Sequence, residues 1–394
     1  MDPDRWRGRR IVFAGGGSGG HLFPGLAMIE LWRELLPDPP EVHWIGSPRR
    51  MEATLIPERG IPFHPLDINY FRRSFSPAAI RQNASVLWRL TTGATFRQAE
   101  AILREVNADL VISLGSFVGG PVVVAAHHAA IPSVVLALDA VIGKAHRWSA
   151  PVADAICVST DEGFAQMSRY GDKVYFTGTP IRPSLFRGDP VAARYEFNIT
   201  QPKPTLLVLG GSQGAAPINA QIPGLWEALN QPGAIGLNIL HQAGEKGIES
   251  VTPPPDSAGS YTVKPFIANM ANAYAICDLV LCRAGANTIA ELSALGKPAI
   301  LIPFAQSAEN HQLRNAQSLA KKGFAICITE DALSTGRLVD TIRALLSDEQ
   351  RLGMMQLIAK AESHPAATGD ASLVCEGVMV RRGRAPAGPL FKEM

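Results

Sequence analysis

An apolar run that ends in a cluster of glycines constrains the fold of this chain more than any other stretch. Residues 11–14 are Ile-Val-Phe-Ala, and residues 15–20 are Gly-Gly-Gly-Ser-Gly-Gly. Apolar residues resume from Leu26 with the spacing of a helix. The stretch therefore predicts a buried strand, a tight turn and the start of a helix.

This glycine turn, which includes Ser18, Gly19 and Gly20, is predicted to seat a phosphate or another polar ligand. Backbone N–H groups approach an anion most easily where no Cβ intervenes, and a helix N-terminus adds partial positive charge. The glycine spacing also fits the dinucleotide-binding fingerprint. However, the acidic residue expected after the next strand is missing, because residues 46–50 are Gly-Ser-Pro-Arg-Arg. A nicotinamide or flavin enzyme is therefore the less favoured alternative.

The length of the chain, 394 residues, is enough for about two domains. A net charge of +2 argues against a general nucleic-acid binder, which normally has a strong basic excess. The five cysteines are scattered and form no Cys-x-x-Cys pair, so we expect thiols in a reducing compartment. No apolar segment precedes the first predicted strand, which favours a cytoplasmic location over secretion.

Strand-like and helical patterns alternate along both halves, which predicts an α/β fold with a parallel sheet in each half. The second half opens like the first, because residues 206–209 are Leu-Leu-Val-Leu and residues 210–215 are Gly-Gly-Ser-Gln-Gly-Ala. Two similar starts predict two similar domains. The expected strands are residues 11–14, 42–45, 110–114, 133–138, 155–159 and 174–177, then 206–209, 236–241, 261–263, 279–281, 299–302 and 325–328.

Prolines and polar residues interrupt the alternation between the two halves. We expect an N-terminal domain over residues 1–183 and a linker over residues 184–204. The C-terminal domain is expected to span residues 205–376. Residues 377–394 are expected to form a poorly ordered tail.

Residues 71–99 lack acidic side chains and mix arginines, including Arg72 and Arg73, with aromatic residues. One interpretation is a surface that lies on an anionic membrane, with basic residues at the headgroups and aromatic rings inserted. The alternative is an ordinary helix with a solvated basic face and a buried aromatic stripe.

A segment of small residues follows the expected strand at residues 279–281 and ends in Glu291. Small residues let the backbone approach a ligand, and a carboxylate one turn into the helix can accept hydrogen bonds from a vicinal diol such as ribose. The alternative is a helix-start glutamate that only favours the helix dipole.

Eight ordered motifs make the chain resemble the MurG-type glycosyltransferases over residues 9–365. These enzymes transfer N-acetylglucosamine from its UDP form to undecaprenyl-pyrophosphate-linked N-acetylmuramyl pentapeptide. The motifs are residues 15–25, 50–53, 178–182, 210–215, 241–244, Phe266-Ile267 with Met270 and Ala271, residues 283–291, and His311-Gln312 with Asn315 and Ala316.

The resemblance implies a GT-B fold, in which two Rossmann-like domains face each other across a cleft, and a UDP-N-acetylglucosamine donor. It implies that Ile267 binds the uracil and Glu291 the ribose. The other expected donor contacts are Ser18, Gly19 and Gly20, Arg182 and Ser212 with the backbone of Ala286, Asn287 and Thr288 at the diphosphate, and His311 and Gln312 at the sugar.

No metal or other cofactor is expected, because the second half has no Asp-x-Asp pair at a strand end. The resemblance also implies an undecaprenyl-linked acceptor and a peripheral location at the cytoplasmic face of the inner membrane. Nucleic acid is not an expected partner.

His21 is the candidate catalytic base. An imidazole that titrates near neutrality can take the proton of an acceptor hydroxyl as that hydroxyl attacks the anomeric carbon. Direct displacement converts the α-linked donor into a β-linked product. The alternative is a histidine that only orders the start of the helix.

The acceptor half departs from the family pattern. Where the family has His-Glu-Gln-Asn, residues 137–140 are Ala-Leu-Asp-Ala, and residues 71–74 replace an Arg-Gly-Lys-like turn. We expect Asp139, Arg72 and Arg73 on the acceptor side, with Asp139 replacing the missing polar contacts. The alternatives are a transferase for another lipid acceptor, a sugar-nucleotide-binding protein without turnover and, less favoured, a UDP-sugar epimerase.

Overall fold

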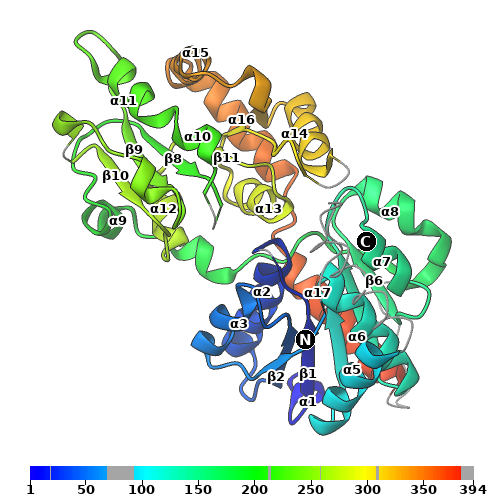
Figure 1. The fold of residues 1–394 in the computed structure, drawn as a ribbon. Coiled ribbons are helices and arrows are strands. Elements are labelled where there is room, and N and C mark those ends of the chain that lie inside the picture. The colour runs from blue at the N-terminus through cyan, green and yellow to red at the C-terminus, as the bar shows by residue number, and fades with distance from the viewer. Residues whose placement is uncertain (18, 69–92, 212–213, 258, 308–309, 383–394) are drawn as a thin grey trace, which may run out of the picture. The chain divides into compact units, whose positions relative to one another are not determined.

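The computed structural model describes residues 1–17, 19–68, 93–211, 214–257, 259–307 and 310–382 (Figure 1). The chain divides into two compact units. Unit 1 consists of two segments, Met1–Arg182 and Ala366–Met394, whereas unit 2 comprises Pro183–Pro365.

Seven parallel strands form the sheet of unit 1, in the order β3-β2-β1-β4-β5-β6-β7. Ile11 of β1 pairs with Val42 of β2 on one side and with Leu110 of β4 on the other. The strands are β1 (Arg10–Ala14), β2 (Glu41–Gly46), β3 (Phe63–Pro65), β4 (Leu110–Ser113), β5 (Ser133–Ala137), β6 (Ala155–Val158) and β7 (Val174–Phe176).

Helices cover both faces of this sheet. Because side chains alternate along a strand, Ile11 and Phe13 pack with α2 and α17, whereas Val12 and Ala14 pack with α5 and α6. The helices of unit 1 are α1 (Pro3–Trp6), α2 (Gly19–Leu35), α3 (Glu52–Leu55), α5 (Ala94–Glu105), α6 (Ser116–His128), α7 (Lys144–Ser149), α8 (Asp161–Met167) and α17 (Ala367–Arg382).

Unit 2 repeats the architecture with six parallel strands in the order β10-β9-β8-β11-β12-β13. The strands are β8 (Thr205–Leu209), β9 (Asn238–Gln242), β10 (Tyr261–Lys264), β11 (Leu279–Cys282), β12 (Ala299–Leu301) and β13 (Ala325–Cys327). The helices are α9 (Pro190–Glu196), α10 (Ala216–Asn219), α11 (Ile222–Asn230), α12 (Met270–Ile276), α13 (Ala286–Leu295), α14 (His311–Lys322), α15 (Thr335–Leu346) and α16 (Glu349–Ala361).

The predicted α/β class and the expected strands are confirmed. One strand, β3, was not predicted from the sequence; it is a three-residue edge strand that ends in Pro65. Such a strand is too short to show the alternation by which strands are recognised.

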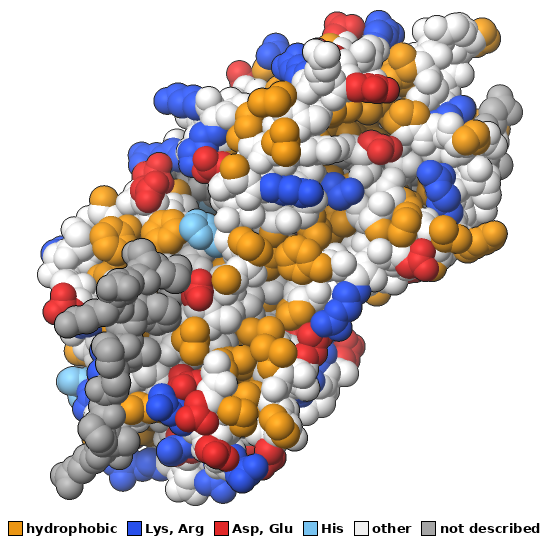
Figure 2. All heavy atoms as spheres, turned by 180° about the vertical axis from the view of Figure 1, so that it is seen from behind, with side chains coloured by type: hydrophobic (Ala, Val, Ile, Leu, Met, Phe, Trp, Pro, Cys, Tyr) orange, Lys and Arg blue, Asp and Glu red, His pale blue; other side chains and the backbone are white. Residues whose placement is uncertain are grey.

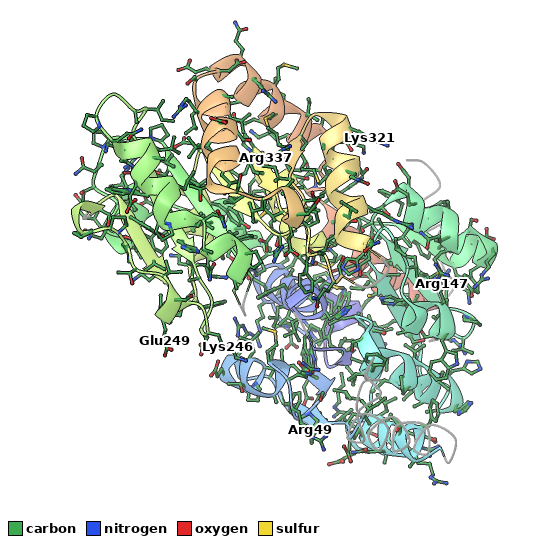
Figure 3. The ribbon with its side chains drawn as sticks, turned by 45° about the horizontal axis from the view of Figure 1, so that its top comes forward. Arg49, Arg147, Lys246, Glu249, Lys321 and Arg337 are labelled. Carbon is green, nitrogen blue, oxygen red and sulfur yellow. The ribbon has the colours of Figure 1, made fainter. Side chains whose placement is uncertain are left out.

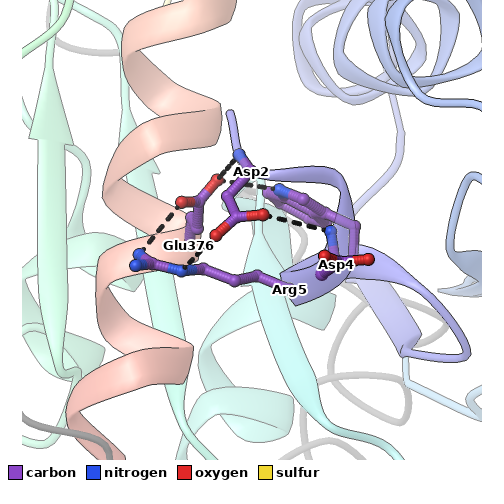
Figure 4. Close-up of polar contacts among 5 residues, drawn as sticks. Asp2, Asp4, Arg5 and Glu376 are labelled. Atoms are coloured by element: carbon purple, nitrogen blue, oxygen red, sulfur yellow. Dashed lines mark hydrogen bonds and ion pairs between the residues drawn. The ribbon is translucent and has the colours of Figure 1, made fainter.

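The domain boundaries differ from those predicted, because α17 packs in unit 1. Trp32 Nε1 donates to Ser372 Oγ at 2.9 Å, and the Thr368 hydroxyl donates to the Ile181 carbonyl at 2.8 Å. The buried Glu376 accepts hydrogen bonds from the Asp2 N–H, Arg5 and Trp6 Nε1 (Figure 4). Residues 366–376 therefore belong to unit 1, and residues 377–382 are helical and not part of a loose tail.

The predicted linker also differs from the structure. Residues 190–196 form α9, and Leu185, Ala193 and Phe197 are buried in the core of unit 2. One of the prolines that suggested a linker, Pro190, lies in the first turn of this helix, and Asp189 caps its N-terminus.

Candidate active site

His21 lies in the first turn of α2, directly after the first glycine turn. Its Nδ1 is 2.8 Å from the carbonyl oxygen of Leu114, which follows β4. A carbonyl only accepts hydrogen bonds, so we assign the ring proton to Nδ1. In the neutral ring, Nε2 is then an acceptor, which is the state that a general base requires.

A second histidine, His146 of α7, lies beside this arrangement and was missed from the sequence. Its ring packs so closely on Gly115 that a Cβ there would lie 2.5 Å from Nε2. Gly115 has a φ of +87°, which favours glycine. Burial, together with the nearby His21, lowers the pKa of His146 to about 3, so its imidazole is neutral at physiological pH. No sequence motif marks this residue.

The first glycine turn forms a hydrogen bond with the side-chain carboxylate of Glu52. Glu52 is fully buried; its Oε2 accepts the Gly17 N–H at 2.9 Å and its Oε1 accepts the Ser47 N–H at 3.0 Å. A Cβ on Gly16 would overlap this carboxylate. The glycines therefore admit an internal anion, and Gly19 and Gly20 begin α2. Their contacts with the donor remain a prediction, and Ser18 lies outside the described residues.

Arg182 is the last residue of the N-terminal segment of unit 1. Its guanidinium lies 5.1 Å from the ring centroid of Phe23 in α2, the helix that carries His21. This cation–π contact holds a positive charge beside α2. Its predicted contact with the diphosphate remains a prediction.

The altered segment at residues 137–140 lies at the end of β5. Gln166 of α8 fixes its backbone, donating to the Ala140 carbonyl at 2.7 Å and accepting the Ile142 N–H at 3.2 Å. Asp139 is partly exposed within this segment. The segment is thus anchored, but the role of Asp139 remains a prediction. Arg72 and Arg73 lie outside the described residues.

In unit 2, Gln242 connects the second glycine turn with the predicted uracil contact. It ends β9, and its Nε2 donates to the Gly211 carbonyl at 3.2 Å, while its Oε1 accepts the Ile267 N–H at 2.9 Å. Gly214 packs directly on the Ala243 carbonyl, where a Cβ would overlap it. The side-chain amide of Gln242 therefore forms hydrogen bonds with both the second glycine turn and the predicted uracil contact. Ser212 lies outside the described residues.

The N-terminus of α13 carries the residues that are predicted to contact the diphosphate. Its first residues are Ala286, Asn287 and Thr288, preceded by Gly285, with no side-chain cap hydrogen bond and no acidic residue in the first turn. The helix dipole at this end therefore favours an anion. Further along α13, Glu291 is 9% exposed and accepts a hydrogen bond from Tyr274.

The predicted sugar contacts, His311 and Gln312, begin α14. Gln312 Oε1 accepts the Phe304 N–H at 3.0 Å, which ties the helix to the loop after β12. Asn315 Nδ2 donates to the Ala284 carbonyl at 3.2 Å, at the turn that precedes α13. Among the described residues of unit 2, the predicted donor contacts thus follow the carboxyl ends of the parallel strands β10, β11 and β12, the edge at which α/β proteins bind ligands.

A half-buried ion pair supports the same loop. Arg283 and Glu330 lie 2.6 Å apart, and Arg283 also donates to the Ile302 carbonyl at 3.2 Å. Across the described residues, no group of three or more His, Cys, Asp or Glu side chains is arranged to hold a metal ion.

The two units match the two halves of one enzyme family. Residues 11–158 match the Glycosyltransferase family 28 N-terminal domain, and residues 205–369 match the Glycosyltransferase family 28 C-terminal domain. With a parallel sheet in each unit, the chain has the architecture of a family 28 glycosyltransferase.

Individual relatives define the family more narrowly. A UDP-N-acetylglucosamine:N-acetylmuramyl-(pentapeptide) pyrophosphoryl-undecaprenol N-acetylglucosamine transferase from Ectopseudomonas mendocina is 35% identical over 374 residues, covering 95% of this chain and 99% of the relative. A transferase of the same name from Desulforamulus reducens is 32% identical over 381 residues, covering 95% of this chain and 100% of the relative. The crystal structure of Acinetobacter baumannii MurG aligns with a TM-score of 0.68 and 26% identity, covering 93% and 99%. The chain belongs to this MurG family of glycosyltransferases.

Proposed function

We propose that the chain transfers N-acetylglucosamine from UDP-N-acetylglucosamine to lipid-linked N-acetylmuramyl pentapeptide, with inversion at the anomeric carbon. The main supporting observation is that Ile267, residues 286–291 and His311, which the family resemblance relates to the donor, all follow the carboxyl ends of strands in unit 2. Relatives that carry this activity in their names match the chain over nearly its whole length.

For the donor, we assign the uracil to Ile267 and the ribose to Glu291. The diphosphate lies at the N-terminus of α13, with Ser212 and Arg182, and the sugar lies at His311 and Gln312. Helix amides and a guanidinium stabilise the negative charge that grows on departing UDP, because both donate hydrogen bonds to phosphate oxygens. The Gln242 contacts support this assignment by fixing the uracil segment to the glycine turn.

For the chemistry, His21 Nε2 removes the proton of the acceptor hydroxyl. The oxygen then forms a bond to the anomeric carbon while the bond from that carbon to the phosphate oxygen breaks, and its electron pair leaves with UDP. Attack opposite to the leaving group gives a β-linked product. The hydrogen bond from Nδ1 to Leu114 supports this role, because it leaves Nε2 as the acceptor.

For the acceptor, we propose that unit 1 lies on the anionic cytoplasmic face of the inner membrane. Phe117 and Trp148 are each about half exposed, and Trp148 lies 5.7 Å from the Phe96 ring. Arg97 and Arg147 are exposed beside these rings in the sequence, and Arg147 projects from the periphery of unit 1 in Figure 3. Aromatic rings edged by arginines suit a headgroup surface.

No helix within the described residues is long and apolar enough to cross a membrane. On the face drawn in Figure 2, acidic and basic side chains are interspersed, and the net charge is only +2. Nucleic acid is therefore not among the partners that we propose.

A transferase for a different lipid acceptor is the second candidate. The observation that favours it is the altered segment at residues 137–140, which carries Asp139 in place of most of the polar side chains of the family. If Asp139 takes over their contacts, Asp139→Ala slows transfer five- to 150-fold, the range expected for one lost hydrogen bond of about 1–3 kcal/mol. Unchanged kinetics in this variant would rule out that role.

The deciding experiment measures transfer of labelled N-acetylglucosamine from its UDP form to a short-chain lipid-linked muramyl pentapeptide, with a control without acceptor. We expect product only when the acceptor is present. Donor binding without transfer would contradict the proposed acceptor and favour another lipid or a binding protein without turnover. Release of free sugar or of an epimer without acceptor would indicate a different reaction.

A further inference from the structure

A buried phenol makes direct contact with the carboxylate that we assign to the ribose. The Tyr274 hydroxyl donates to Glu291 Oε2 at 2.8 Å, and Tyr274 is 1% exposed. Burial raises the pKa of Tyr274 well above its usual range, and the charge of Glu291 raises it further. The phenol therefore stays protonated and acts as a hydrogen-bond donor at any physiological pH.

The segment that carries Tyr274 also carries the predicted uracil contact. Tyr274 lies in α12, whose N-terminus is capped by the side chain of Asn269, two residues after Ile267. Glu196 of α9 accepts hydrogen bonds from both Asn269 and Asn272. Residues 267–274 are thus held by several contacts on one side, while the phenol reaches α13 on the other.

We infer that Tyr274 is a positioning residue for donor recognition, which fixes the Glu291 carboxylate so that it accepts hydrogen bonds from the ribose hydroxyls. This inference rests on the proposed donor site. A carboxylate on a flexible side chain would lose rotational freedom on binding, and the phenol imposes that restriction before the ligand arrives. The contact also couples the ribose carboxylate to the uracil segment through α12.

The test compares UDP with 2′,3′-dideoxyuridine diphosphate, which lacks both ribose hydroxyls, by titration calorimetry. The variant is Tyr274→Phe, which keeps the ring and removes only the hydroxyl. The matched control is Tyr261→Phe, because Tyr261 is also buried in unit 2 and places its hydroxyl 3.1 Å from His241 Nδ1. Thermal unfolding of each variant verifies that it is folded.

We expect Tyr274→Phe to bind UDP about tenfold more weakly, equivalent to about 1.4 kcal/mol. Its affinity for the dideoxy nucleotide should stay within twofold of that of the wild type, because the hydroxyls that Glu291 contacts are absent. The control should bind both nucleotides like the wild type. In transfer assays, the expected change in Tyr274→Phe is a higher KM for the donor with little change in kcat.

Equal loss of affinity for both nucleotides in Tyr274→Phe would overturn the inference, because the hydroxyl would then only support the fold. Unchanged UDP affinity in a folded variant would overturn it as well. If the wild type itself does not distinguish the two nucleotides, Glu291 does not contact the ribose, and the proposed donor site fails together with the inference.

Discussion

The two glycine turns of the chain begin alike and are used differently. Each turn follows the strand that lies third from one edge of its parallel sheet. This strand is β1 in unit 1 and β8 in unit 2. In the first turn, the Glu52 carboxylate accepts the hydrogen bond of the Gly17 amide. In the second, Gly214 packs on the Ala243 carbonyl and Gln242 holds the Gly211 carbonyl.

The difference shows that a glycine turn is not by itself a ligand site. Whether its amides are available depends on side chains elsewhere in the chain, and Glu52 lies 35 residues after Gly17. In the function that we propose, unit 1 uses its turn to order the start of α2, where His21 acts as the base. We propose that unit 2 uses its turn and α13 to bind the nucleotide.

Removing His21, the proposed base, should show the largest difference between the roles of the two units. His21→Ala is expected to lower turnover at least ~100-fold, because proton transfer in the transition state is lost. Donor affinity should stay within about twofold, since the residues that we assign to the uracil, the ribose and the sugar lie in unit 2. Steady-state kinetics and calorimetry with UDP-N-acetylglucosamine measure both. His128→Ala, at the exposed end of α6, is the control. An unchanged rate in His21→Ala would remove His21 from the chemistry.

Removing the internal carboxylate should affect stability. Glu52→Ala leaves the Gly17 and Ser47 amides without their acceptor, at a cost of about 2–3 kcal/mol. For a domain of this size, we expect the melting temperature to fall by about 5–10 °C. Glu58→Ala changes an exposed glutamate nearby and should leave the melting temperature unaltered. If Glu52→Ala melts like the wild type, the carboxylate does not hold the first turn.

Acid should lower the free energy of unfolding of both units. Burial lowers the pKa of His146 in unit 1 to about 3 and that of His241 in unit 2 to about 4. Between these values and about 6.5, the unfolded imidazoles bind protons and the folded ones do not, so stability falls as the pH falls. From pH 7 to pH 5, each histidine is expected to cost about 2 kcal/mol.

Melting curves at pH 5 and pH 7 test this dependence. His146→Phe should reduce the acid sensitivity, because phenylalanine does not titrate, whereas His128→Ala should leave it as in the wild type. An equal loss of melting temperature between pH 7 and pH 5 in wild type and His146→Phe would show that His146 does not contribute.

The alternation of apolar strands and helical segments was sufficient to predict the fold class, since parallel strands buried on both faces form continuous apolar runs. It could not assign α17, because a helix that follows unit 2 in the sequence packs in unit 1 through Ser372 and Glu376. Such long-range packing leaves no periodic signal.

At the site, the family motifs predicted His21 and Glu291, whose surroundings suit the roles assigned to them. They assigned no role to the neighbours that position or restrict these residues, although Glu52 lies within the motif at residues 50–53. Glu52, His146 and Tyr274 act through contacts between distant segments, and their side chains alone, a buried acid, imidazole and phenol, resemble ordinary core residues. Only the three-dimensional structure shows what they touch.

Hydrogen exchange with and without UDP tests the division between the units most directly. We expect UDP to slow amide exchange at residues 206–216 and 284–292, and to leave residues 11–17 unchanged, because Glu52 already accepts the hydrogen bond of the Gly17 amide. Slower exchange at residues 11–17 with no change at residues 284–292 would contradict this division and place the nucleotide in unit 1.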